Sequence, residues 1–295
     1  MLELNIKRGI NFHTKDYNLT DDLATEKYFK LVKKEGFDHV RLPVRGKHLE
    51  ELGDEFLDHV ENVCNTALAC GLIPIMDLHW YYDMNKRPLE LKDDFLKLWD
   101  RLASYWVNMD KRVIYEICNE PCHEYTFPLV NVIQNEAIKV IRKHQPDRIL
   151  LAACAHYNTI EHLHFLELPE DDENIAVEIH DYTPMALTHQ TMGSRPKTDY
   201  QWDTPEMREY LDARLHVAAV WAKMHKRRLH LGEFGVCCRV DLDQRVSWMK
   251  YMVELCDKYD IAYAPWDFRI DFALYDREKE EWYPGILDAL LPDRK

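Results

Sequence analysis

Apolar residues along the chain follow two alternating patterns, one typical of helices and one typical of buried strands. The clearest helical stripe consists of Phe56, Leu57, Val60, Val63, Cys64, Ala67 and Leu68. Their spacing puts them on one face of a helix, and Gly71 follows at the point where such a helix would end. Residues 72–76 then form a short continuous apolar run, which is typical of a strand buried on both faces. The pattern therefore predicts a helix that leads directly into a parallel strand.

The same order of helix and strand recurs from end to end. The further helices expected are 23–35, 93–109, 127–145, 205–225 and 241–259. The further strands expected are 4–11, 37–44, 112–118, 148–154, 175–180, 229–233 and 261–267. Such alternation requires a parallel sheet, and eight strands favour its closure, so we predict an α/β fold, a single (β/α)8 TIM barrel. An open doubly wound sheet is the alternative, but no Gly-rich phosphate loop follows any expected strand.

Composition narrows the domain organisation and the classes of partner. The chain has 295 residues, 46% of them hydrophobic, and shows neither a linker-like segment nor a repeat. We therefore expect one domain over residues 1–295. The net charge of −14 would repel a phosphate backbone or an anionic membrane surface, and no apolar run reaches the roughly 18 residues of a membrane span. We expect no nucleic-acid or membrane partner and a monomeric protein, whereas neutral substrates are compatible with this charge.

The N-terminus and the cysteines indicate where in the cell the protein is expected to be. Residues 1–8 lack the basic start and long apolar stretch of a signal peptide. The eight cysteines form no Cys-x-x-Cys pair, and Cys64, Cys118 and Cys154 lie in apolar segments, as buried free thiols would. We expect a cytoplasmic protein from the sequence as it stands, or a secreted one if it is a processed mature form.

Polar or aromatic residues follow the apolar run of every expected strand. In chain order these residues are Asn11, His13, Arg41, His79, Trp80, Asn119, Glu120, His156, His180, Tyr182, Glu233 and Trp266. In a (β/α)8 barrel the C-terminal ends of the strands meet on one face, where the active site lies. Because buried polar groups are costly without partners or a use, the pattern predicts a functional site on that face.

Two carboxylates stand out among these residues. Glu120 ends the run that begins at Val113, and Glu233 ends the run that begins at Leu229. Hydrolysis of a glycosidic bond needs two carboxyl groups flanking the bond, roughly 5–5.5 Å apart in the retaining mechanism. One must keep its proton near neutral pH and the other must stay ionised, which a nearby Arg41 would favour. A salt bridge at the barrel rim is the alternative for each Glu taken alone.

The chain resembles glycoside hydrolase family 5, the cellulases, β-mannanases and related β-glycanases, along essentially its whole length. The matching stretches are Arg8-Gly9-Ile10-Asn11, residues 36–44, Asn119-Glu120-Pro121, residues 178–184, residues 187–190, Gly232-Glu233-Phe234-Gly235, Trp266-Asp267-Phe268 and residues 274–276. The resemblance is closest to bacterial and thermophilic endo-β-1,4-glucanases that also accept mannans. It implies a retaining endo-β-1,4-glucanase of β-glucan and possible glucomannan or mannan, with no cofactor and no metal.

The resemblance also implies a role for each matching residue. Glu120 would be the general acid/base and Glu233 the nucleophile. Supporting roles would fall to Arg41 beside the nucleophile, His79 at the floor of the cleavage subsite, Asn119 at the sugar 2-hydroxyl, His180 and Tyr182 at the two carboxyl groups, and Trp266 as a stacking platform. Candidates for outer subsites are Asn11, Trp80 and Trp202, together with Tyr81 and Tyr82, although ordinary packing explains the aromatic ones equally well.

Departures from the family pattern leave the substrate open. The chain has His79-Trp80 where many relatives have two histidines, and His13-Thr14, residues 191–195 and residues 268–273 also differ. Altered loops at 80–90, 190–202 and 268–273 could build a blocked pocket, so an exo-acting β-glucosidase or β-mannosidase-type enzyme on short oligosaccharides is an alternative. A non-catalytic glycan-binding barrel and a metal-dependent barrel are further alternatives; the first would lack one carboxylate, and no His-x-His stands at a strand end.

Overall fold

The computed structural model describes residues 2–14, 17–19, 24–79 and 81–294. Eight parallel strands form one sheet in the order of the sequence. They are β1 (Gly9–Asn11), β2 (His39–Arg45), β3 (Ile73–His79), β4 (Ile114–Glu116), β5 (Leu150–Ala152), β6 (Ile175–His180), β7 (Leu229–Glu233) and β8 (Ala262–Tyr263). A parallel bridge between Arg8 and Tyr263 brings β8 back beside β1, so the predicted (β/α)8 barrel is confirmed.

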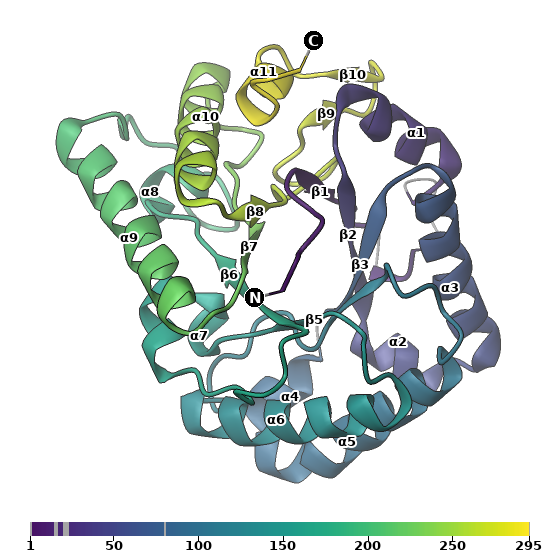
Figure 1. Ribbon diagram of the computed structural model, residues 1–295. Helices are drawn as coiled ribbons and strands as arrows, with labels where there is room; N and C mark the ends of the chain where they lie inside the picture. Colours follow the sequence, from purple (N-terminus) through teal and green to yellow (C-terminus); the bar gives the residue numbers. More distant parts are fainter. Residues whose placement is uncertain (1, 15–16, 20–23, 80, 295) are drawn as a thin grey trace.

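Helices surround the strands on all sides (Figure 1). The long ones are α1 (Glu26–Glu35), α3 (Asp54–Ala69), α5 (Pro88–Tyr105), α6 (Phe127–His144), α9 (Pro205–Met224) and α10 (Leu242–Tyr259). Shorter elements are α2 (Gly46–Glu51), α4 (Tyr82–Lys86), α7 (Ala155–Asn158), the 3-10 helix η2 (Ile160–Phe165), α8 (Met185–Thr188), α11 (Ile286–Leu290) and a hairpin of β9 (Tyr275–Asp276) with β10 (Glu281–Trp282). No described helix is long and apolar enough to cross a membrane.

Helix α3 shows how the sequence pattern becomes structure. Its seven predicted stripe residues are all buried, and Asp54 and Glu55 in its first turn suit the positive end of the helix dipole. Burying one such side chain contributes about 1.5–3 kcal/mol. Beyond the helix, Gly71 adopts a φ of +81°, which residues with a Cβ rarely tolerate, and Leu72 turns into β3. A Gly71→Ala substitution would strain this turn.

The opening strand is shorter than predicted. Only residues 9–11 of the expected 4–11 pair with β2, because Leu4 and Ile6 turn their side chains into a small apolar cluster. Residues Ile75, Ile114 and Leu151 supply the strand side of this cluster. In Figure 1 the N-terminal segment lies in front of the middle of the ring, at the end of the barrel where the strands begin. The apolar N-terminus therefore closes that end.

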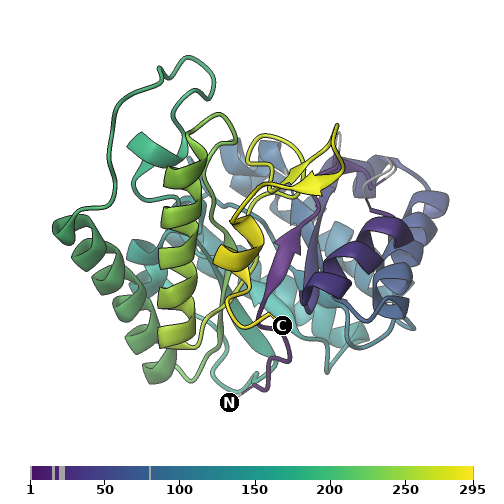
Figure 2. The same ribbon diagram turned by 90° about the horizontal axis from the view of Figure 1, so that it is seen from above.

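The other half of the barrel interior is polar. Arg41, Asp77, Glu116, Glu178 and His230 all lie on strands and are all 0% exposed. Buried charges require partners, and these residues supply one another with partners beneath the face where the strands end. On that face the segment between α8 and α9 projects beyond the rest of the molecule (Figure 2).

Candidate active site

The fold brings Glu120 and Glu233 together from opposite parts of the sequence. Glu233 is the last residue of β7, and Glu120 follows β4. A carboxylate oxygen of each, together with a ring nitrogen of His180, lie within 4.8 Å of one another. The side chain of Glu233 is 7% exposed and that of Glu120 is 27% exposed. This short separation is what the retaining mechanism needs, because one carboxylate must reach the anomeric carbon directly.

Glu233 is held by three groups that favour its ionised form. Arg41 donates from Nη1 to Oε1 at 2.9 Å, and the Tyr182 hydroxyl donates to Oε2 at 3.0 Å. His180 Nδ1 lies 3.7 Å from Oε2. Burial raises the pKa of the Glu233 carboxyl, but the positive charges of His180 and Arg41 outweigh burial, so its pKa lies below the usual value. Glu233 is therefore an ionised carboxylate, as a nucleophile must be.

Glu120 has the opposite tendency. Burial raises its pKa, a hydrogen bond of 2.8 Å with His180 Nδ1 lowers it, and the negative charge of Glu233 raises it again. The net direction is upward, so Glu120 holds a proton to higher pH than an ordinary glutamate does. The pKa of His180 lies well above its usual value, because Glu233, Glu120 and Glu178 outweigh the effect of burial. One protonated and one ionised carboxyl group are what acid-assisted glycoside cleavage requires.

Arg41 organises the floor of the site. Its Nε and Nη2 donate to the two oxygens of Glu116, both at 2.7 Å, and Nη2 lies 2.9 Å from Asp77 Oδ2. Nη2 also donates to Asn119 Oδ1 at 2.6 Å. Since the amide oxygen of Asn119 is taken by Arg41, its amide nitrogen is the group that can donate to a sugar hydroxyl.

Asn11 is not an outer subsite, and that prediction is wrong. The residue is 0% exposed. Its Nδ2 donates to the carbonyl oxygens of Gly232 at 2.7 Å and Ala264 at 2.9 Å, and its Oδ1 accepts from Arg41 at 3.0 Å. Asn11 thus connects β1 to the end of β7 and to the segment after β8, and its side-chain oxygen holds the guanidinium of Arg41 in position.

Trp202 is not an outer subsite either. It is 0% exposed and lies in the segment before α9, with its ring centre 5.7 Å from that of Tyr251. The Arg208 guanidinium covers the ring at 5.2 Å. A ring enclosed in this way has no free face for a sugar, so the alternative of ordinary packing is correct here. Trp80 lies outside the described residues.

Trp266 takes part in a closed cluster of four rings. Its ring centre lies 5.5 Å from that of His79 and 4.9 Å from that of His13. Tyr17 completes the cluster, stacked at 4.6 Å on His79 and at 4.5 Å on His13. Burial is the largest influence on the pKa of His79 and lowers it well below the usual value, so this ring is neutral. His79 forms a 2.6 Å hydrogen bond from Nδ1 with Asp77 Oδ2.

Tyr17 was not found from the sequence. It stands in the loop after His13, where no hydrophobic period marks a position as buried or exposed. Burial and the nearby Glu233 raise the pKa of its hydroxyl, so the group is uncharged. Its stacking position makes it a wall of the site beside the predicted platform.

A cavity of about 210 Å³ opens next to Glu120. Its lining consists of Leu78, Tyr81, Asn85, Cys118, Asn119, Glu120, Cys122, His123 and Tyr157. Because Glu120 is the group that would protonate the leaving oxygen, this cavity lies where the leaving part of a substrate would bind. Of the aromatic candidates for outer subsites, Tyr81 reaches it; the side chain of Tyr82 lies outside what the structure describes.

Asn158 is a further residue that the sequence did not reveal. Together with His156 and Tyr157 it forms a run of left-handed backbone, with φ values of 58°, 63° and 57° from residue 156 to 158. Its Oδ1 accepts from the backbone N–H of Cys154 at 3.0 Å, and its Nδ2 donates to the carbonyl oxygen of Asn119. These bonds hold an unfavourable backbone in place and fix the neighbour of the acid/base. Left-handed conformation leaves no mark in a hydrophobic pattern.

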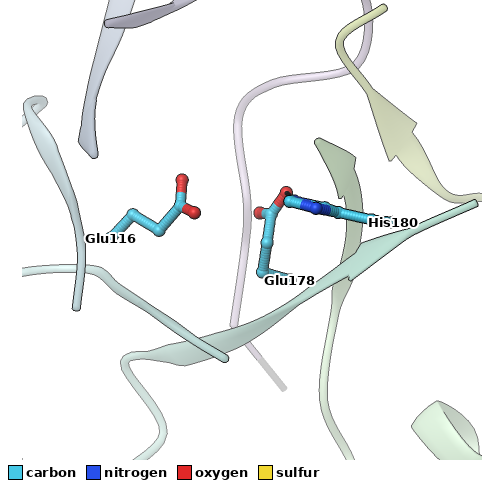
Figure 3. A group of neighbouring side chains, drawn as sticks. All are labelled: Glu116, Glu178 and His180. Carbon is cyan, nitrogen blue, oxygen red and sulfur yellow. Dashed lines mark ion pairs between the residues drawn. The ribbon is translucent and has the colours of Figure 1, made fainter. Parts of the chain in front are cut away.

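Among the residues that the structure describes, two groups of side chains have the spacing to hold a metal ion. One is Glu116, Glu178 and His180, and the other is Glu120, His180 and Glu233. Figure 3 shows the first group, with the carboxylate of Glu116 directed towards Glu178 and His180 from a different strand. His180 belongs to both groups, and its two ring nitrogens already face Glu120 and Glu178. Arg41 and His180 supply the positive charge that these carboxylates need.

Comparison with known proteins gives one consistent result. A model of the family described as cellulase (glycosyl hydrolase family 5) matches residues 6–271. Endoglucanase H of Acetivibrio thermocellus is 27% identical over 282 residues; the match covers 90% of this chain and 30% of that protein's length. The chain thus spans about a third of this relative.

Solved structures are similar over nearly the whole chain. A hyperthermophilic endo-β-1,4-glucanase in complex with substrate has a TM-score of 0.92 at 27% identity, with 98% of this chain and 97% of that chain covered. Cel5A of Thermotoga maritima in complex with cellobiose has a TM-score of 0.91 at 29% identity, with 97% of both chains covered. The same protein in complex with mannotriose has a TM-score of 0.90 at 29% identity, with the same coverage.

Proposed function

The chain belongs to glycosyl hydrolase family 5, the cellulase family, and on that basis we propose that it is a retaining endo-β-1,4-glucanase. Glu233 attacks the anomeric carbon while Glu120 protonates the leaving oxygen, and Glu120 then activates the water that releases the sugar. The observation that carries this proposal is the pairing of the two carboxyl groups within 4.8 Å with pKa shifts in opposite directions.

The remaining site residues each have a defined task in this reaction. Arg41 and Tyr182 keep Glu233 ionised and aim one of its oxygens, since each donates to a different carboxylate oxygen. His180 bridges the two carboxyl groups through Nδ1. Asn119 offers its amide nitrogen to a sugar hydroxyl, and a hydrogen bond there strengthens as the oxocarbenium-like transition state forms.

The substrate is proposed from the relatives. Endoglucanase H and the hyperthermophilic enzyme are described as glucanases, and Cel5A has been solved with cellobiose and with mannotriose. We therefore propose β-1,4-glucan as the substrate, with glucomannan and mannan as the second class. That the chain acts as a monomer stays a prediction.

An exo-acting enzyme on short oligosaccharides has one observation in its favour. Tyr17 stacks on His79 and His13 and so forms a wall on the side of the site where the aromatic cluster lies. On the other side, next to Glu120, the cavity of about 210 Å³ leaves room for a substrate. A site closed on one side would release sugars from a chain end. Endo action, by contrast, cuts the chain in its middle.

One experiment tests the reaction and separates these two modes. Wild type and Glu233→Gln are incubated with carboxymethylcellulose, mixed-linkage glucan, glucomannan, galactomannan, xylan and laminarin, and reducing ends and viscosity are followed together. We expect reducing ends from the β-1,4-linked glucans, lost in the variant, with viscosity falling early. Reducing ends without an early fall in viscosity would favour exo action, and a folded wild type that releases none from any polymer or cello-oligosaccharide would contradict the proposal.

A further inference from the structure

A column of polar side chains runs through the barrel beneath the two carboxyl groups. Its members are His180, Glu178, His230, His39 and Asp38. His180 Nε2 lies 3.4 Å from Glu178 Oε1, and Glu178 Oε2 lies 2.7 Å from His230 Nδ1. His230 Nε2 and His39 Nε2 are 3.0 Å apart, and His39 Nδ1 lies 2.5 Å from Asp38 Oδ1. All members except Asp38 are at most 2% exposed, so the column joins the site to the opposite end of the barrel.

Two glycines make room for this column. A Cβ on Gly232 would lie 1.5 Å from Glu178 Oε1, and a Cβ on Gly9 would lie 2.2 Å from His39 Nε2. Gly232 and Gly9 belong to β7 and β1, and neither has the positive φ that calls for glycine on conformational grounds. Both positions are therefore glycine because polar side chains occupy the space, which shows that the barrel interior is built around them.

The hydrogen bonds fix the number of protons on the two imidazoles. His230 and His39 face each other through Nε2, so one of these two nitrogens must carry a proton and the other must accept it. Their Nδ1 atoms face the carboxyl groups of Glu178 and Asp38, whose pKa values are both lowered, and both Nδ1 atoms donate when these groups are ionised. Three protons on two imidazole rings make one positive charge. The pair of His39 and His230 therefore carries this charge in the barrel interior when both carboxyl groups are ionised.

Glu178 is ionised in this setting. Burial raises the pKa of its carboxyl, but the charges of His230 and His180 outweigh burial and bring the pKa to about 2. Its Oε1 has no hydrogen-bond partner at ordinary distance among the described residues and is directed at His180. In Figure 3 Glu178 and His180 lie side by side on β6.

We propose that Glu178 and His230 are positioning residues that hold His180 in its charged form beside Glu120 and Glu233, and so set the pH range in which the enzyme works. The part of this inference that concerns activity rests on the proposed function. The part that concerns the charge of His180 does not depend on any substrate.

Other charged and titratable groups also face His180 and Glu178. From the neighbouring strands and the segments that follow them they are Arg41, Asp77, His79, Glu116, Glu120, Cys154 and Glu233. All of them remain when Glu178 alone is changed. A shift seen in a Glu178 variant therefore reports the loss of the charge on Glu178 and whatever that loss does to His180.

The direction of the shift in Glu178→Gln distinguishes the possible outcomes. If His180 loses its charge without Glu178, then Glu120 and Glu233 both lose a nearby cation, and the pKa of each rises. The acidic and the basic limb of kcat/KM against pH then both move to higher pH, by about one unit. If His180 keeps its charge, the removal of an anion lowers both pKa values and the limbs move to lower pH.

The test compares Glu178→Gln with two controls. Asp38→Asn removes a carboxylate from the far end of the column without touching His180, so its pH profile should match wild type. Glu178→Asp keeps the charge but withdraws it from His180, so it should move both limbs to higher pH by less than Glu178→Gln, and it replaces that variant if Gln does not fold. A shift to lower pH, or no shift, in a folded variant would overturn the inference.

A second readout uses no substrate. Nitrogen-15 NMR of the histidine-labelled wild type should show two imidazolium rings at neutral pH, His180 and one of His39 and His230. The signals are assigned with variants in which one histidine at a time is replaced. The pKa of His180 should fall in the Glu178 variant. If His180 is neutral in wild type, or if its pKa is unchanged in the variant, the inference is wrong even when the enzyme is an active glucanase. If both NMR results hold but no glycan is cleaved, the proposed function fails, and the effect of Glu178 on the charge of His180 stands.

Discussion

Glu233 and Glu120 are identical side chains a few ångströms apart, and the protein surrounds them differently. Glu233 accepts hydrogen bonds from Arg41 and Tyr182 and is 7% exposed. Glu120 is 27% exposed, borders a cavity, and is hydrogen-bonded to one side chain of the described residues, His180. Burial alone would raise the pKa of both. The difference teaches that the number of cations and donors around a carboxyl group, rather than its depth, decides which becomes the nucleophile and which the acid.

The largest effect should come from removing either carboxylate. Glu233→Gln should lower kcat roughly 10⁴-fold or more on every substrate, because it abolishes the attacking group. Glu120→Gln should lose as much on cello-oligosaccharides but far less kcat/KM on an aryl β-cellobioside with an acidic phenol, whose departure needs no proton. Steady-state kinetics on both substrates measures this, and equal losses on both for Glu120→Gln would mean that Glu120 is not the acid.

Removing the cation on the Glu233 side should be the next largest change. Arg41→Met leaves Glu116 without its bidentate partner and should lower the free energy of unfolding by about 3–5 kcal/mol. The pKa of Glu233 should rise, so the acidic limb of the pH profile should move to higher pH. Denaturant unfolding and kcat/KM against pH measure the two effects.

Arg148→Met is the matched control for this change. Arg148 is 3% exposed and donates to backbone carbonyl oxygens of Val113 and Met109, away from the two carboxyl groups. It should lower stability and leave the acidic limb in place. If Arg148→Met moved the limb as Arg41→Met does, the shift would report loosening of the barrel and not the loss of a charge.

A smaller loss of activity is expected when the hydroxyl group of Tyr182, the second hydrogen-bond donor to Glu233, is removed. Tyr182→Phe removes the hydrogen bond to Glu233 Oε2 and keeps the ring. A hydrogen bond to a charged group contributes about 1.5–3 kcal/mol, so kcat should fall roughly 10–100-fold and the acidic limb should move slightly upward. An unchanged kcat would show that Arg41 alone holds the nucleophile.

The smallest effect concerns the aromatic wall. Tyr17→Ala removes the stacking contacts with His13 and His79, worth about 0.5–1.5 kcal/mol each. We expect kcat/KM to fall several-fold through KM, with both pH limbs unchanged, whereas Tyr17→Phe should behave like wild type. A Phe variant as weak as the Ala variant would assign the role to the hydroxyl group instead of the ring.

The sequence predicted those parts of the fold and of the site that follow from the regular alternation of helices and strands in a barrel. The strands were predicted because buried parallel strands leave continuous apolar runs, and Glu120 and Glu233 were found because they stand where such runs end. Trp202 and Asn11 were misplaced because their burial depends on elements far away in the chain, Tyr251 for one and β7 for the other. The sequence position of Asn11 and Trp202 therefore did not show whether their side chains face the substrate site.

The polar interior of the barrel left a signal that was not used. Glu178 and His230 each interrupt an apolar run inside a strand, and Glu116, the last residue of β4, interrupts the apolar run of residues 113–118. Such interruptions indicate buried polar groups that need partners. Which groups pair, however, depends on the register of neighbouring strands, where Glu178 stands beside His230. Tyr17 and Asn158 left no comparable signal, because loop conformation is set by contacts that the pattern does not encode.

The chemical course of the reaction tests the central claim most directly. Incubation with an activated 2-deoxy-2-fluoro-β-cellobioside should trap the glycosyl-enzyme, because the fluorine slows its hydrolysis, and proton NMR of the unmodified substrate should show the β-anomer formed first. We predict that peptide mass spectrometry finds the label on Glu233 and that the label is absent from Glu233→Gln. A first-formed α-anomer, or a label on Glu120, would contradict the assignment of Glu233 as nucleophile.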